Sequence, residues 1–281
     1  MSNRKKYDKH LVLKQLIYRF ESHNISTFGT EIAYFLLMSI FPFIMFLMAI
    51  LGFMKISVKE TLLGIYNYMP YKESSLYVME NYLDYLFNQQ HYFILFFSLI
   101  FTIWTASKGV NAIFNALDKA YDTASSRSYF KRRGIAYLYT VLLGIIIVII
   151  TTVPIFGEIV LSYLDQYQIK LNLLFWIIAK FKILLLGSIF LFVLISIYYI
   201  APNKKLTLKS VLPGSIFTLI GWVILSFGYS IYVKFFTKYT IIYGSLGALI
   251  LFMIWFWFLG IILVLGGEIN AILWDYEKIK N

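Results

Sequence analysis

Cysteine is absent from this chain of 281 residues, histidine occurs three times, and charged residues make up only 14%. Without cysteine there are no disulfides, no thiolate metal ligands and no thiol nucleophile. The low share of charge argues against a soluble protein, because soluble domains carry about 25% charged residues. His10, His23 and His91 stand far apart in the sequence, whereas hydrolytic metal centres need clustered histidine and carboxylate ligands. We therefore predict a protein that is not an enzyme and that holds no metal or cofactor.

Long apolar runs dominate what the chain does contain, since 60% of its residues are hydrophobic and 20% are aromatic. The stretch from Tyr239 to Gly267 has no charged side chain, and a run of about 18 or more such residues can cross a bilayer as a helix. The runs are continuous rather than alternating, which excludes a membrane β-barrel. The prediction is an all-α integral membrane protein with about six transmembrane helices. Within a single domain, 29–274, they cover about residues 32–54, 92–117, 134–157, 173–200, 210–233 and 240–267.

The positive charge of the chain predicts its orientation. Lysine and arginine total 25 against 14 acidic residues, a net charge of +11. Most of these cations fall in the first 28 residues and in the loops 118–133 and 201–209, and cytoplasmic loops are the usual place for them. Both termini are therefore predicted to be cytoplasmic. Because anionic lipid on that side accounts for the charge, nucleic acid is not expected as a partner.

Three segments are predicted to lie outside the spans. Residues 1–28 carry Leu13, Leu16, Ile17 and Phe20 on one helical stripe beside many cations, which is typical of an amphipathic helix on an anionic membrane surface; a merely basic tail is the alternative. Residues 55–91 predict a short amphipathic helical segment on the outer surface, between the first two spans. Residues 275–281 are predicted to form a cytoplasmic tail.

Five polar residues map towards the cytoplasmic ends of spans one, two and six, namely Glu31, Lys108, Asn111, Glu268 and Asn270. Ionisable groups at membrane depth are costly unless they are paired or hydrated, so they predict a polar site within the bundle. Simpler interpretations stay open for each. Glu31 suits the positive end of a helix, Lys108 can extend to the headgroups, and Glu268 with Asn270 can lie in the headgroup layer.

The positions of two further groups of charged residues predict roles for them. Arg132 and Arg133 follow span two in a basic loop, where they are predicted to contact lipid headgroups. Glu158 ends span three on the outer side, and Lys180 and Lys182 lie early in span four. These three residues predict an outer-side charge pair, unless the two lysines are interfacial anchors.

Four sequence blocks in chain order resemble one known family. They are GTEIAYFLLMSIFPF from Gly29, ASKGVNAIFNALDKAYD from Ala106, LPGSIFTLIGW from Leu212, and YGSLGALILFMIWFWFLGIILVLGGEINA from Tyr243. Together they resemble the YihY/BrkB family of bacterial inner-membrane proteins, once labelled "ribonuclease BN". The family pattern near the end of the last span is Gly-Ala-Glu, whereas this chain has Gly266, Gly267 and Glu268.

The resemblance implies a multi-pass protein of the bacterial inner membrane, tied to envelope integrity and to lipid or lipopolysaccharide export. The predicted function is movement of a lipid or other amphiphile across or within the membrane, with membrane lipids and envelope proteins as partners. A scaffold in envelope assembly is the alternative, and small residues at Gly244, Gly247 and Ala248 would suit a homo-oligomer. A ribonuclease is not expected, because His10 with His23 is a weak acid–base pair.

Overall fold

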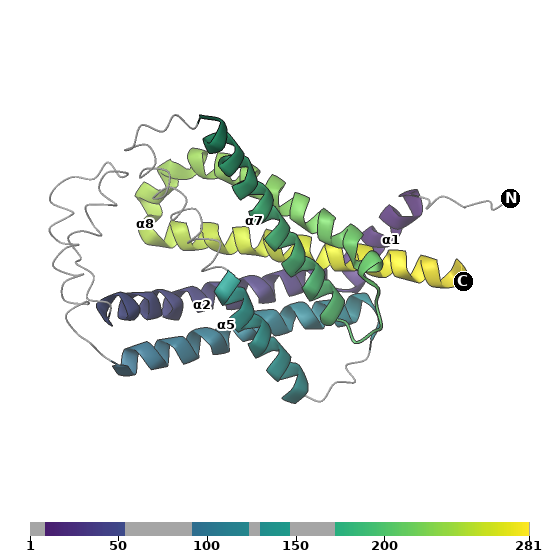
Figure 1. Cartoon of the computed structure of the whole chain (residues 1–281), viewed down its shortest axis with the longest axis horizontal. Coiled ribbons are helices and arrows are strands. Elements are labelled where there is room, and N and C mark those ends of the chain that lie inside the picture. The colour runs from purple at the N-terminus through teal and green to yellow at the C-terminus, as the bar shows by residue number, and fades with distance from the viewer. Residues whose placement is uncertain (1–8, 54–91, 124–129, 147–171, 281) are drawn as a thin grey trace. The chain divides into compact units, whose positions relative to one another are not determined.

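The computed structural model describes residues 9–53, 92–123, 130–146 and 172–280, and the regular structure in these ranges is helical throughout. The helices are α1 (Lys9–Ser22), α2 (Ile25–Phe53), α5 (Tyr92–Ala120), the helical residues 130–146, α7 (Asn172–Ile200) and α8 (Leu208–Lys280), as Figure 1 shows. The all-α prediction is confirmed for this part of the chain. The outer segment 55–91 and the end of predicted span three lie outside the described residues.

In the part of the chain that the structure describes, four helical stretches are long and apolar enough to cross a membrane: Ile25–Ile50, Tyr92–Ala120, Leu208–Val233 and Leu249–Lys278. Many of their large apolar side chains face outwards; on Leu208–Val233, for example, Val223, Ile224 and Phe227 are 64–72% exposed. Apolar side chains on the outside of a helix bundle suit contact with lipid rather than water. The chain is therefore a helical membrane protein.

By their contacts, the residues form two compact units, Phe35–Ala106 and the remainder of the chain. The smaller unit carries an aromatic ladder on α5, in which Phe93, Phe97 and Phe101 follow one another at every fourth residue. Their ring centroids are 5.7 and 5.9 Å apart, and Trp104 continues the ladder at 5.4 Å from Phe101. All four rings are exposed, as expected for a surface that faces acyl chains.

The N-terminal part of the chain breaks at Asn24, which corrects two predicted boundaries. Asn24 has a φ of 57°, a left-handed conformation that asparagine tolerates and that ends a helix. Its N–H donates to Glu21 O at 3.0 Å, and its carbonyl accepts from the N–H of Thr27 and of Phe28. Residues 1–28 therefore do not form one surface helix. The first span helix begins at Ile25 rather than Ile32.

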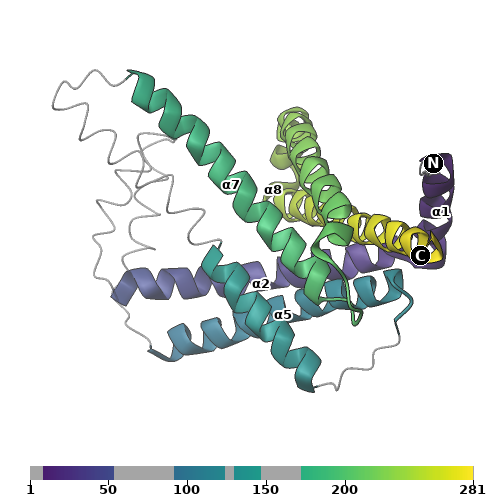
Figure 2. The same cartoon turned by 45° about the vertical axis from the view of Figure 1, so that its right-hand side comes forward.

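The helix α8 turns back on itself. Its first arm, Leu208–Val233, and its second arm, Leu249–Lys278, pair Gly214 with Asn270, Trp222 with Leu259 and Tyr229 with Trp255. As the first number of each pair rises the second falls, so the arms are antiparallel and lie side by side in Figures 1 and 2. The arms correspond to predicted spans five and six. The helix itself continues past the predicted end of span six at Gly267, to Lys280.

A capping box starts α8. Thr207 precedes the helix, and its Oγ1 accepts the backbone N–H of Ser210 at 3.3 Å. In return, the N–H of Thr207 donates to Ser210 Oγ at 3.2 Å. This reciprocal pairing satisfies two backbone donors that a helix start leaves without partners. It places the first turn of the arm where the chain leaves the loop after α7.

The close approach of the two arms is built around Tyr198 of α7. The Tyr198 hydroxyl donates to Leu263 O at 2.7 Å, lies 2.6 Å from Thr218 Oγ1, and is fully buried. A side chain at Gly266 would place its Cβ 2.1 Å from Thr218 Oγ1, 2.5 Å from the Tyr198 hydroxyl and 2.8 Å from Gly214 O. Only glycine therefore fits at position 266.

The adjacent glycines provide a matched test of this packing. We expect Gly266→Ala to lower the free energy of unfolding by about 3 kcal/mol, because overpacking a rigid core costs about 1–3 kcal/mol and here a backbone oxygen cannot move aside. We expect Gly267→Ala to cost less than about 1 kcal/mol. Its closest neighbour is a terminal methyl group of Leu117, which can rotate. Thermal unfolding in detergent micelles measures both. Equal losses in the two variants would contradict this account of the packing.

Candidate functional site

A buried carboxylate in the second arm of α8 forms the centre of the candidate site. Glu268 is fully buried, and its two oxygens are bonded to Arg19 of α1 and to His23, which directly follows α1. Arg19 Nη1 donates to Glu268 Oε2 at 3.2 Å, and His23 Nδ1 lies 2.6 Å from Oε1. A buried carboxylate without a cation would be strongly disfavoured. The position of Glu268 in the fold therefore depends on Arg19.

Arg19 also connects α1 to two other parts of the structure. Its Nη1 donates to Ala120 O at the end of α5, at 3.1 Å, and its Nη2 pairs with Asp275 Oδ2 of α8 at the same distance. The guanidinium group can do this because its five N–H donors form a rigid, planar fork. We call Arg19, His23, Glu268 and Asp275 the Arg19 network. Figures 1 and 2 show α1 beside the C-terminal end of α8, where this network lies.

Tyr121, directly after α5, lies against the Arg19 network. The residue is 2% exposed, and its hydroxyl has no hydrogen-bond partner among the described residues. Burial raises the pKa of this hydroxyl, and the nearby carboxylates of Asp275 and Glu268 raise it further. Tyr121 therefore stays neutral, and its hydroxyl can donate or accept a hydrogen bond beside the network.

Asn270, one turn along from Gly266, joins the two arms of α8. Its Oδ1 accepts the N–H of Gly214 at 2.6 Å, and its Nδ2 donates to Val211 O at 3.0 Å. Pro213 lies between these backbone groups, and proline interrupts the regular bonding of a helix. The Asn270 amide therefore satisfies backbone groups beside the proline. Asn270 is fully buried, and its amide has two partners within the protein.

A second polar cluster joins α5 to the helical residues 130–146. Arg132 donates to Asn111 Oδ1 at 3.1 Å and to Asn115 Oδ1, and it pairs with Asp118 Oδ2 at 3.3 Å. The other Asp118 oxygen accepts from Thr123 Oγ1 and from the N–H of Asn203. The side chain of Arg132 is thus directed towards α5. Its neighbour Arg133 lies 5.0 Å from the centre of the Tyr137 ring.

The structure brings together only some of the residues that the sequence predicted as a site. Glu268 and Asn270 are both buried on α8, but they bond to different partners, whereas Asn111 on α5 belongs to the Arg132 cluster. Glu31 on α2 and Lys108 on α5 are each partly exposed. Glu158 and the side chains of Lys180 and Lys182 lie outside the described residues, although α7 does begin at Asn172, near the predicted Leu173.

The sequence prediction missed Arg19, His23 and Asp118. Arg19 was one of many cations in the N-terminal segment, and nothing local set it apart from Lys14. One signal was available: His23 follows Arg19 by four residues, so the two side chains leave the same face of a helix. Asp118 stands in a sequence block that was recognised for its resemblance and was not assigned a role.

Among the described residues, no three His, Asp or Glu side chains gather as metal ligands would.

Comparisons with known proteins agree on a membrane family. A family model described as "Virulence factor BrkB" matches residues 16–280. The "Putative ribonuclease-like protein YfkH" of Bacillus subtilis is 34% identical over 269 residues, which are 96% of this chain and 97% of that protein. No solved structure matches the chain.

Shorter matches lead to proteins named only for the membrane. A "UPF0761 membrane protein" of Coxiella burnetii is 24% identical over 114 residues, or 40% of this chain and 41% of that protein. A second, from Psychrobacter, is 27% identical over 184 residues, or 64% of this chain and 31% of the relative. These names specify a membrane location and no activity.

The ion pair between Arg19 and Glu268 can be tested with a double-mutant cycle. We expect Arg19→Gln to lower the free energy of unfolding by about 3 kcal/mol or more, because it leaves a buried carboxylate without its cation. The double variant Arg19→Gln/Glu268→Gln should be more stable than Arg19→Gln alone, because it removes that charge. Thermal unfolding in detergent is measured for the wild type, for Arg19→Gln, for Glu268→Gln and for the double variant. Lys14→Gln, on the exposed side of α1, is the control, and additive losses would disprove the coupling.

Proposed function

Because the chain belongs to the BrkB family of membrane proteins, we propose that it moves a lipid or other amphiphile across or within the membrane for envelope maintenance. The observation that carries the proposal is the Arg19 network. In this network, Arg19 of α1 and the neighbouring His23 bond to a buried carboxylate near the end of a candidate span. Ionisable groups of this kind in membrane proteins are commonly functional.

The chemistry of Arg19 supports an anionic substrate group. Guanidinium binds carboxylate and phosphate with the same planar fork, and arginine is preferred for both. A lipid phosphate that reaches α1 would therefore compete with Glu268 and Asp275 for the same N–H donors. Tyr121, buried beside them, supplies a further hydroxyl. Exchange of Arg19 between Glu268 and a phosphate would couple headgroup binding to the position of α1.

The exposed face of α1 supports a location at the membrane surface. Leu13, Ile17 and Tyr18 are 57–73% exposed, whereas Arg19 turns towards α8. A helix with apolar side chains on its outer face is suited to lie in the headgroup layer. In this proposal α1 would contact lipid on one side, while its Arg19 bonds to the carboxylate of Glu268 on the other.

We further propose the full topology of six spans, with both termini on the cytoplasmic side of the bacterial inner membrane. The four candidate spans and the apolar helix Leu184–Ile200 support it. Helical residues 130–146 form the described part of the remaining span. In this topology the Arg19 network and the basic loops lie on the cytoplasmic side, where anionic lipid is enriched.

A scaffold in envelope assembly remains the second candidate, and the bonding of Glu268 and Asn270 favours it. Each polar atom of these two side chains already has a partner inside the protein. Such saturation is what a purely structural clamp between helices requires. In a scaffold, Arg19 and Glu268 would hold α1 in place without ever exchanging partners.

We propose no nuclease activity for this chain, although one relative is named ribonuclease-like. Of its three histidines, His23 is bonded to Glu268, a combination that resembles the histidine–carboxylate pair of a general base. Arg19 occupies the other oxygen of that carboxylate, however, and the pair is largely buried. A buried carboxylate oxygen needs a hydrogen-bond partner, and this need accounts for the same pair.

The topology can be tested directly, because the chain has no cysteine of its own. We expect Ser22→Cys and Lys205→Cys to react with a membrane-impermeant maleimide only after cells are opened. The variant His91→Cys, at the predicted outer side, should react in intact cells. Labelling of Ser22→Cys in intact cells would overturn the proposed orientation.

Lipid movement can be measured in reconstituted liposomes with fluorescent phospholipid that is bleached from outside. We expect the protein to expose the inner pool at least about tenfold faster than empty vesicles. We expect Glu268→Gln to abolish this gain, because a neutral amide cannot take Arg19 back from the lipid phosphate and so ends the exchange. The control is Glu21→Gln, an exposed acid on α1, which should keep the full rate.

The same experiment separates the two candidate functions. If Glu268→Gln is stable and abundant but inactive, the carboxylate acts on the substrate. If the variant loses abundance instead, and the wild type does not exceed empty vesicles, the scaffold is the correct assignment and phospholipid movement is rejected.

A further inference from the structure

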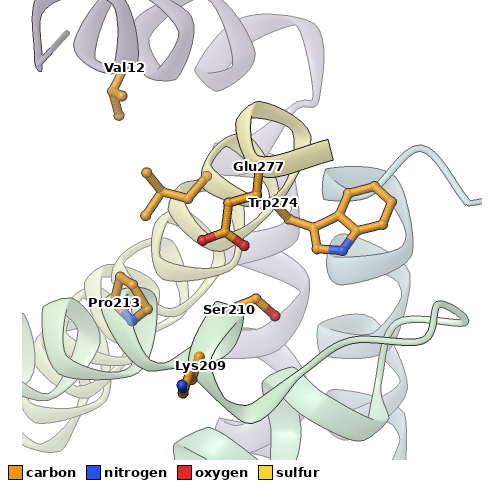
Figure 3. A pocket seen from close by; sticks show the side chains of 7 residues that line it. Val12, Lys209, Ser210, Pro213, Trp274 and Glu277 are labelled. Carbon is orange, nitrogen blue, oxygen red and sulfur yellow. The ribbon is translucent and has the colours of Figure 1, made fainter. Parts of the chain in front are cut away.

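A pocket of about 360 Å³ lies between α1 and the two ends of α8 (Figure 3). Its walls come from three places in the chain: Val12 from α1, Lys209 and Pro213 from the start of α8, and Trp274 and Glu277 from its end. Pockets that bind small ligands typically measure about 300–1,000 Å³. The volume therefore suits a small polar group rather than a whole lipid.

The position of the pocket identifies the kind of ligand that it meets. One candidate span begins at Leu208 and another ends at Lys278, so in the proposed topology the pocket would lie where both arms of α8 leave the apolar layer. Phospholipid headgroups occupy this depth of a bilayer. A ligand in the pocket would thus be the headgroup of a lipid whose acyl chains remain in the membrane.

The pocket presents opposite charges from its two α8 walls. Lys209 and Glu277 both line it, and both side chains are exposed to solvent. Figure 3 shows Lys209 on the wall from the start of α8, and Glu277, from its end, with its carboxylate directed into the space between. An ammonium group of lysine attracts phosphate, and a carboxylate attracts a cation. A ligand that carries both a phosphate and an ammonium group matches this pair.

Apart from Ser210, the rest of the lining is apolar. Val12, Pro213 and Leu273 supply aliphatic surface, and the indole of Trp274 forms one side. The ammonium groups of Lys204 and Lys278 lie 4.6 and 5.1 Å from the centre of that indole ring, distances that indicate cation–π attraction. Tryptophan is the residue typical of this membrane depth, and it can contact the glycerol part of a lipid.

We propose that this pocket binds the headgroup of a phospholipid that carries a phosphodiester and a primary ammonium group, as phosphatidylethanolamine does. Lys209 contacts the phosphate and Glu277 the ammonium group. The site is separate from the Arg19 network and concerns binding alone, so it holds whether the protein moves lipid or serves as a scaffold. Failure of the liposome assay would leave this assignment intact.

Native mass spectrometry of the detergent-purified protein, titrated with phosphatidylethanolamine or phosphatidylglycerol, tests the assignment. We expect wild-type protein to bind phosphatidylethanolamine more tightly. Glu277→Gln should weaken that binding by about fivefold and leave phosphatidylglycerol unchanged, because about fivefold is the upper range for one ion pair near the surface. Lys209→Gln should weaken the binding of both lipids.

Matched controls exclude a general effect of charge. Lys205→Gln and Glu21→Gln change the same charges at exposed positions outside the lining, and both should bind as the wild type does. Val12→Trp, which fills the pocket from α1, should reduce phosphatidylethanolamine binding without any change in charge.

Three results would overturn the proposal. The first is equal wild-type affinity for the two lipids, and the second is retention of full binding by both Glu277→Gln and Val12→Trp. The third is binding of soluble phosphoethanolamine as tight as that of the lipid, which would show that the site does not recognise a membrane lipid.

Discussion

The rest of the structure depends on the bonding of one buried carboxylate, that of Glu268. Glu268 has no exposed surface, and an isolated buried charge is among the most costly groups in a protein. Arg19 of α1 and His23, directly after it, offset that cost. Because Arg19 also binds Ala120 and Asp275, one guanidinium joins the ends of three helices. An amphipathic helix that would otherwise be a separate surface element thereby becomes part of the bundle.

The hairpin of α8 supplies the rigid frame for that ion pair. Its arms approach through Gly214 and Gly266, and Tyr198 of α7 closes the contact. Asn270 then joins the arms beside Pro213 with two hydrogen bonds. Since Glu268 lies between Gly266 and Asn270 in the sequence, the same close packing that requires glycine also directs the carboxylate towards α1. The candidate site is thus a consequence of helix packing as well as of charge.

Much of the architecture followed from local sequence. Apolar length predicted the helices that became α2, α5 and the two arms of α8, and an acid followed by an amide at the end of an apolar run marked Glu268 and Asn270 as unusual. The helices extend beyond the predicted span boundaries near Ile32 and Gly267 for a common reason. Hydropathy reports where apolar residues stop, whereas a helix continues until a residue such as Asn24 ends it or its polar groups lose their partners.

The sequence by itself determined that this is a helical membrane protein of the BrkB family. The length and continuity of the apolar runs, and the four sequence blocks that resemble the family, can each be read from a single segment. Only the tertiary structure decided which cation neutralises Glu268, that Arg132 turns towards Asn111 and Asp118, and that a pocket forms between the two ends of α8. Arg19 and Glu268 are 249 residues apart. Partners at that separation are chosen by the lateral packing of helices, which no periodicity within one helix specifies.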